Sequence, residues 1–298
     1  MKPSPELLNF YRSHSPFSRS ERLQIAPDQS LADLVQVVQN HLLHYAWPRA
    51  YGLEIPEDQY QQINTRFVDR FLEARAQSGC ALQNRTLPEQ RHLGCCRDFS
   101  LFLTAMLREK GIPARNRVGF AGYFQKGHWH DHVITEFWNG ERWVRVDAQL
   151  DELQRQAVGI SFDPLDLPDD QEVYVTAAEA WQLYRSGQID PQHYAVFPGS
   201  PFQGPNFIRL NLLHELWALN KRELLLWEGP ELFHQHIHDL SEADLVKLDE
   251  LAADLTTRPE SLETLQKWLN APEPLEIRCI APNGFQEVWN WNTLQSGA

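Results

Sequence analysis

The chain is 298 residues long, and 42% of its residues are hydrophobic, including 15 Phe, 10 Trp and 8 Tyr. A chain of this length buries about 75% of its unfolded surface, which excludes a disordered or low-complexity protein. Its 27 Lys and Arg against 40 Asp and Glu give a net charge of −13. This balance argues against a general affinity for nucleic acid or an anionic membrane, because both need a basic face.

Four cysteines are present, Cys80, Cys95, Cys96 and Cys279. They are too few for a disulfide scaffold, and a bridge between the adjacent Cys95 and Cys96 would be strained. The first residues contain no apolar run typical of a signal peptide, and no stretch of about 18 apolar residues predicts a membrane span. We therefore expect a cytoplasmic protein with free thiols and with neither nucleic acid nor membrane as a partner.

The chain length suggests about two domains. Residues 28–76 show mostly helical spacing of apolar side chains. The motifs are densest in residues 94–151, and residues 163–170, with two prolines and four acids, read as a boundary loop. We predict a catalytic core with N-terminal helices over residues 1–165 and a mainly helical region over residues 166–298.

A buried helix is predicted from Cys96 to Lys110, because apolar residues occupy more than one face of this segment. Gly111 fits the position after the helix end, and Pro113 prevents continuation. Cys95 and Cys96 then lie at the helix N-terminus, where free N–H groups and the helix dipole stabilise a thiolate. The alternative is a pair of small buried residues without chemistry.

A β-hairpin is predicted next. Residues 132–138 and 141–147 are rich in β-branched and aromatic side chains, and the Asn-Gly pair between them favours a two-residue type I′ turn. That turn sets His132 directly opposite Asp147, with Cβ atoms about 5 Å apart. A catalytic imidazole and its orienting carboxylate need such proximity. A surface His–Asp pair is the alternative, and a slip of register would break the argument.

Four segments, taken together, resemble the core of the transglutaminase-like superfamily, a branch of the papain-like cysteine enzymes. They are GCCRDFS (94–100), LREKGIPAR (107–115), the pair Asp131-His132, and WVRVD (143–147). The resemblance follows the family's order of Cys, His and Asp, and it covers residues 94–151. It implies an α+β fold with a Cys-bearing helix packed on a small antiparallel sheet and extra helices at both ends.

The resemblance also implies the chemistry. The context Cys-Arg-Asp-Phe matches the nucleophile to Cys96 rather than Cys95, His132 to the general base, and Asp147 to the acid that orients it. Such a triad attacks an amide in a peptide, a protein or a small molecule and forms an acyl-thioester, which water or an amine then resolves. By analogy with the family, a peptidase or amidase is preferred over a cross-linking acyltransferase.

Further candidates surround the triad. Gln90 lies six residues before Cys96, which is similar to the glutamine spacing in papain relatives, so it is a candidate oxyanion donor; the alternative is a solvated loop glutamine. Trp129, His130 and Trp143 are candidates for the walls of a substrate cleft. The alternative for the tryptophans is core packing.

Two other classes of function stay open. The H-x-H-x-H spacing of His128, His130 and His132 would put three imidazoles on one face of a strand, as in a metal enzyme. His234 and His238 would share one face of a helix. No H-E-x-x-H motif or calcium loop occurs, so we expect neither a metal nor a cofactor. The remaining alternative is a non-catalytic interaction module that retains the fold.

Overall fold

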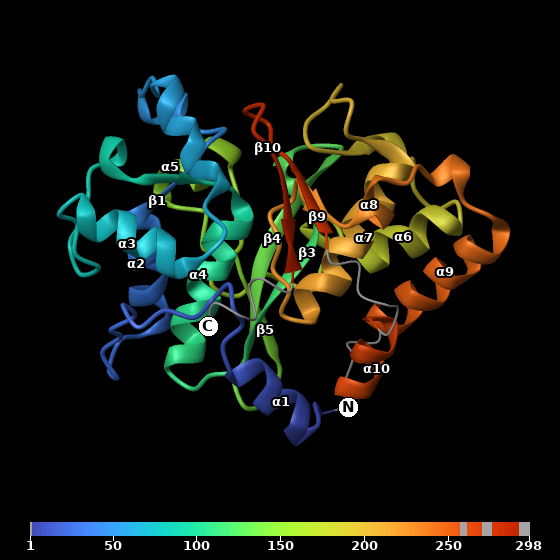
Figure 1. Ribbon diagram of the computed structural model, residues 1–298, viewed down its shortest axis with the longest axis horizontal. Helices are drawn as coiled ribbons and strands as arrows, with labels where there is room; N and C mark the ends of the chain where they lie inside the picture. Colours follow the sequence, from blue (N-terminus) through green and yellow to red (C-terminus); the bar gives the residue numbers. More distant parts are fainter. Residues whose placement is uncertain (1, 257–260, 270–275, 292–298) are drawn as a thin grey trace.

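The computed structural model describes residues 2–256, 261–269 and 276–291. Its central sheet has the strand order β5-β4-β3-β6, and β7 joins it by pairing with β4. Every pair in this sheet is antiparallel except β4 with β7. Figure 1 shows the sheet between two groups of helices, one containing α4 and the other α7.

The strands of the described residues have the following bounds: β1 (Leu42–His44), β2 (His92–Gly94), β3 (Ala114–Gln125), β4 (His128–Trp138), β5 (Trp143–Val146), β6 (Tyr174–Thr176), β7 (Tyr194–Ala195), β8 (Glu228–Gly229), β9 (Glu276–Ile280) and β10 (Gln286–Asn290). Strands β1 and β2 form a separate parallel pair, and β8, β9 and β10 form a third, antiparallel sheet.

The helices of the same residues have these bounds: α1 (Pro5–Arg12), α2 (Leu31–His41), α3 (Val68–Gln77), α4 (Cys96–Glu109), α5 (Glu152–Val158), α6 (Ala177–Arg185), α7 (Gly204–Leu219), α8 (Glu231–His234), α9 (Glu242–Thr256) and α10 (Leu262–Gln266). No helix in the described ranges is long and apolar enough to cross a membrane.

Helix α4 forms where the sequence predicts it. The Asp98 carboxylate accepts the Cys95 N–H at 2.8 Å, which caps the helix start. Gly94 makes room for this cap, because a Cβ there would lie 2.8 Å from Asp98 Oδ2. The helix ends before Gly111, whose φ of +72° suits the residue after a helix C-terminus. Helix α4 packs against β4, while α7 packs against β3.

The predicted hairpin is present, but its predicted register is wrong. Trp138 pairs with Trp143 rather than with position 141, and Thr135 pairs with Val146. The loop is longer than a two-residue turn because the Asn139 side chain accepts the N–H groups of both Glu141 and Arg142. A shift of two residues keeps each side chain on the same face of the sheet, so His132 and Asp147 are still on the same side.

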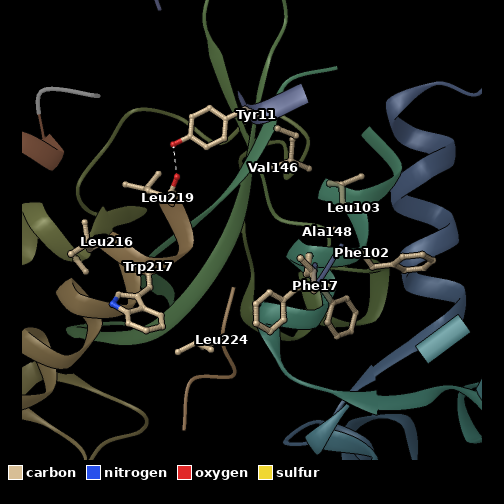
Figure 2. Packing of buried hydrophobic residues seen from close by; sticks show 14 of the residues in the cluster. Tyr11, Phe17, Phe102, Leu103, Val146, Ala148, Leu216, Trp217, Leu219 and Leu224 are labelled. Carbon is tan, nitrogen blue, oxygen red and sulfur yellow. Dashed lines mark hydrogen bonds between the residues drawn. The ribbon is translucent and has the colours of Figure 1, made fainter. Parts of the chain in front are cut away.

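The main hydrophobic core joins the two ends of the chain. Figure 2 shows Tyr11 of α1 pointing at the end of α7, where its hydroxyl donates to the Leu219 carbonyl at 2.9 Å. Phe102 of α4 and Trp217 of α7 belong to the same cluster. This packing holds the cysteine helix in place against elements from both termini.

The prediction of an α+β fold, with a Cys-bearing helix on a small antiparallel sheet and extra helices at both ends, is confirmed. The division at residues 165 and 166 stays a prediction. The sheet itself takes strands from both sides of that point, since β6 and β7 follow it in the chain.

Candidate active site

Cys96 is the first residue of α4 and is 4% exposed. Three neighbouring side chains, those of Cys95, His132 and His44, stabilise the negative form of its sulfur. The hydrogen bond from Cys95 lowers the pKa of the Cys96 thiol well below its ordinary value, and His132 and His44 act in the same direction. Burial opposes them without reversing the direction. Cys96 therefore has the environment of a reactive thiolate.

The adjacent Cys95 behaves in the opposite way. Its hydrogen bond to Cys96 and its burial raise the pKa of the Cys95 thiol well above its ordinary value. Cys95 thus keeps its proton and shares it with the neighbouring sulfur. The directions of these two pKa shifts agree with Cys96 as the candidate nucleophile.

His132, on β4, is paired with Asp147, just after β5. The distance from His132 Nε2 to Asp147 Oδ2 is 2.8 Å, and both residues are buried. Burial alone would lower the pKa of His132, but the charge of Asp147 and the hydrogen bonds to Asp147 and Cys96 raise it to about 10. Since Nε2 is engaged by Asp147, Nδ1 is the nitrogen left for the sulfur. The three residues named from sequence are brought together.

Asp147 is itself held by two further groups. The Tyr123 hydroxyl donates to its Oδ2 at 2.6 Å, and the Gln149 N–H donates to its Oδ1 at 2.9 Å. Both donors hold the Asp147 carboxylate in place, and this carboxylate in turn orients the His132 ring. Tyr123 was not among the predicted site residues, because it lies in the irregular stretch of β3 between Ala121 and Gln125, which no local sequence pattern marks.

A second imidazole, that of His44, also lowers the pKa of the Cys96 thiol. His44 is the last residue of β1 and pairs with Gly94 of β2, two residues before Cys96. The sequence analysis missed it as well, because only the pairing of two segments that are far apart in the chain brings it to the helix.

Asp131, next to His132, is a second acidic residue near the sulfur. Burial raises the pKa of the Asp131 carboxyl to about 8, and the negative charge of Cys96 acts in the same direction. At neutral pH this carboxyl is therefore protonated, and it adds no negative charge beside the sulfur.

Of the predicted cleft residues, His130 lies nearest to the triad. The ring of Phe124 stands 5.1 Å from that of His132 and 5.9 Å from that of His130. His130 Nδ1 donates to the Val196 carbonyl at 3.0 Å, so its ring is fixed beside the strand. Phe124 and His130 thus form one aromatic side of the site.

The two predicted tryptophans are placed differently. Trp129 stacks on Tyr194 at 5.3 Å. Trp143 is packed in the main core, edge-on to Tyr11 and 4.0 Å from the Arg115 guanidinium. The structure therefore brings Trp143 to the core instead of the triad, and this corrects its assignment to a cleft wall.

Gln90 lies exposed in a short 3₁₀ turn, where its side-chain oxygen accepts the Leu87 N–H at 3.1 Å. This local bond supports a capping role. The assignment of Gln90 as an oxyanion donor stays a prediction that the geometry does not favour.

The histidine spacing does not build a metal centre in the described part of the chain, where no three His, Cys, Asp or Glu side chains are grouped to hold an ion. The His128 ring instead packs edge-on against the His193 ring, with ring centroids 5.2 Å apart. His132 is already engaged by Asp147 and Cys96.

Comparisons with known proteins find a family similarity in the middle of the chain. Residues 54–148 match the model of the transglutaminase-like superfamily. A solved structure described as a "Putative Cysteine Protease" from Cytophaga hutchinsonii is similar at 18% identity and a TM-score of 0.32. The similarity covers 49% of this chain and 43% of that protein, so less than half of either. No curated protein matches the sequence.

Proposed function

Residues 54–148 carry a transglutaminase-like core, and from this premise we propose that the chain is a cysteine hydrolase that cleaves an amide bond through an acyl-thioester. The observation that carries the proposal is the arrangement of Cys96, His132 and Asp147, with a lowered pKa on the thiol and a raised pKa on the imidazole. A thiolate beside an imidazolium supplies both the nucleophile and the proton that the leaving amine needs.

The first half of the reaction uses that ion pair directly. The Cys96 sulfur forms a bond to the carbonyl carbon, and the electron pair of the C=O bond moves to the oxygen. As this pair returns, the C–N bond breaks, and His132 gives its Nδ1 proton to the leaving nitrogen. Asp147 holds the ring in position and stabilises its positive charge.

The second half resolves the acyl-thioester. His132, now neutral, takes a proton from the acceptor, which attacks the thioester carbonyl and releases the Cys96 sulfur. We propose water as the acceptor, because hydrolysis needs no second substrate site beside the triad. An amine would use the same three residues, so the acceptor is a matter for experiment.

The oxyanion requires hydrogen-bond donors. The Cys96 N–H is the first of α4 and lies before the residues whose N–H groups bond back to the Cys95 carbonyl, and the positive end of the helix dipole lies there. We infer that the Cys96 N–H is one donor to the oxyanion.

Substrate access requires side chains to move. Cys96 is 4% exposed and His132 is 2% exposed, so the resting site is covered. Phe124, edge-on to the His132 ring, is the side chain that we expect to be displaced as an amide enters. We also propose that the protein works in the reducing cytoplasm, because a free Cys96 thiol is required.

The test is cleavage of a peptide library, followed by mass spectrometry of the new termini, with wild-type protein, Cys96→Ala and the control Cys80→Ala. We expect new termini with the wild type and with Cys80→Ala and none with Cys96→Ala. A parallel reaction with a fluorescent primary amine separates hydrolysis from transfer. Equal cleavage by Cys96→Ala and the wild type would overturn the proposal, and amine-labelled products in place of new carboxylates would correct the acceptor.

A further inference from the structure

We propose that His44 is a catalytic residue of this site, which donates a hydrogen bond from Nε2 to the Cys96 sulfur and then to the oxyanion of the tetrahedral intermediate. The proposal rests on the proposed function, since it concerns the same reaction. It goes beyond the family match, because His44 lies outside residues 54–148.

The backbone places His44 beside the nucleophile. Strand β1 pairs in parallel with β2, in a register that sets His44 opposite Gly94. The Tyr45 N–H donates to the Gly94 carbonyl at 2.9 Å and extends this pairing to the start of α4. Because Gly94 leads through Cys95 into the helix, this ladder fixes the backbone of His44 relative to that of Cys96. The His44 side chain lowers the pKa of the Cys96 thiol, in keeping with this proximity.

The tautomer of His44 follows from a second contact. The Ala46 N–H donates to His44 Nδ1 at 3.2 Å. A nitrogen that accepts from a backbone amide carries no hydrogen, so in this ring the hydrogen is on Nε2. His44 therefore has a hydrogen-bond donor at Nε2, the ring nitrogen that is not engaged by the Ala46 N–H.

Ring packing orients that donor. The His44 ring stacks on Tyr45, with ring centroids 5.0 Å apart and an interplanar angle of 19°. Phe99, one turn into α4, lies 6.5 Å from the same ring. A donor whose direction is fixed before the reaction stabilises developing charge without reorganisation.

His44 thereby takes the role of oxyanion donor, for which Gln90 was the candidate predicted from the sequence. Gln90 is occupied by the Leu87 N–H, while His44 offers an N–H at the sulfur. In the step itself His44 transfers no proton: as the C–S bond forms and the carbonyl electron pair moves to oxygen, its hydrogen bond passes from sulfur to the adjacent oxygen. When the C–N bond breaks, the proton for the leaving nitrogen comes from His132.

Two variants separate hydrogen bonding from packing. His44→Phe keeps an aromatic ring on Tyr45 and removes the donor, while His44→Gln keeps an N–H donor and removes the ring. His132→Ala serves as the reference for loss of the ion pair. His234→Ala, which removes an exposed imidazole on α8, is the matched control.

The readout is the pH dependence of Cys96 alkylation by iodoacetamide, followed by mass spectrometry. We expect the midpoint to rise by about one pH unit in His44→Phe, which is the effect of losing one hydrogen bond to a thiolate, and to return most of the way in His44→Gln. The His234→Ala midpoint should equal that of the wild type. Thermal unfolding of each variant confirms that it is folded.

The outcomes are distinct. A midpoint unchanged in His44→Phe but raised in His132→Ala overturns the role of His44 and leaves the proposed function standing. A midpoint raised by both His44 variants alike shows a packing role and overturns the proposal too. If neither His44→Phe nor His132→Ala moves the midpoint, both the proposal and the proposed function fail. The readout needs no substrate, so an unsuccessful substrate search leaves this test intact.

Discussion

At the level of single residues, the environment favours the charged forms of both Cys96 and His132. The pKa of the thiol is lowered and that of the imidazole is raised to about 10. Over the range between the two values, the sulfur is negative and the ring is positive. The rate of amide cleavage should therefore rise at low pH as Cys96 ionises. It should fall again near pH 10, because a His132 that has lost its proton cannot protonate the leaving amine.

Asp147→Asn tests the orienting carboxylate. An amide cannot stabilise the imidazolium, so the pKa of His132 should fall and cleavage should drop by about 10³–10⁴-fold. Steady-state kinetics on a substrate from the peptide library measures the loss. Asp28→Asn, at an exposed position, is the control, and equal loss in both variants would contradict this role.

Cys95 gives a second prediction at this scale. Cys95→Ala removes the donor that acts most strongly on Cys96, so the pH midpoint for Cys96 alkylation should rise. Cys95→Ser keeps a donor and should restore a lower midpoint. Identical midpoints in Cys95→Ala and wild type would show that the neighbouring thiol does not support the nucleophile.

At the scale of elements, a buried ion cluster ties three strands together beside the site. Glu136 of β4 is contacted by Arg115 and Arg117 of β3 and by Arg145 of β5, with Arg115 Nε at 2.9 Å. Burial alone would raise the pKa of Glu136, but the three arginines lower it from 4.5 to about 2. These strands carry His132 and Tyr123, so the cluster supports the catalytic geometry.

Glu136→Gln leaves buried arginines without their shared carboxylate, and we expect a loss of about 3–5 kcal/mol in the free energy of unfolding at pH 7. Because the pKa is lowered by folding, the stabilisation is present above about 4.5 and is lost as the pH falls through about 2. The difference in the free energy of unfolding between Glu136→Gln and the wild type should therefore become smaller at acid pH. Urea unfolding at several pH values measures it.

The matched control is Glu141→Gln, on the exposed loop of the same hairpin. It should change the unfolding free energy by less than about 0.5 kcal/mol. If the Glu136→Gln protein is as stable as this control, the ion cluster contributes nothing to the free energy of unfolding.

Local signals explain which elements the sequence predicts. Helix α4 follows from the apolar run and Gly111, and the hairpin follows from Asn139-Gly140 between two β-rich segments. The register was missed because the Asn139 side chain bonds two backbone N–H groups and lengthens the loop. His44 was missed because the β1–β2 pairing joins segments about 50 residues apart, which no local pattern encodes.

At the level of the whole molecule, the N-terminal helix α1 meets the end of α7, from the later half of the chain. Tyr11 donates to Leu219 at 2.9 Å, packs against Trp143 and lies 5.2 Å from the Arg115 guanidinium. Residues 1–165 contain the whole triad, yet α7, from the later half, covers β3. The N-terminal and C-terminal regions therefore both support the catalytic sheet.

Tyr11→Phe removes only the hydroxyl and leaves the Leu219 carbonyl without this donor. We expect the free energy of unfolding to fall by about 1–2 kcal/mol, measured by urea unfolding. The control is Tyr60→Phe, at a half-buried position in a different part of the chain. If Tyr11→Phe is no less stable than this control, the contact does not join the two ends energetically.

The pH dependence of cysteine alkylation, read site by site in wild type and in His132→Ala, tests whether Cys96 and His132 form a thiolate–imidazolium pair. We expect wild-type Cys96 to react faster than Cys80, Cys95 and Cys279, with a midpoint well below the free-thiol value of about 8.5, and His132→Ala to raise this midpoint. A Cys96 that reacts no faster than the other three cysteines, with a midpoint unaffected by His132→Ala, would contradict this expectation.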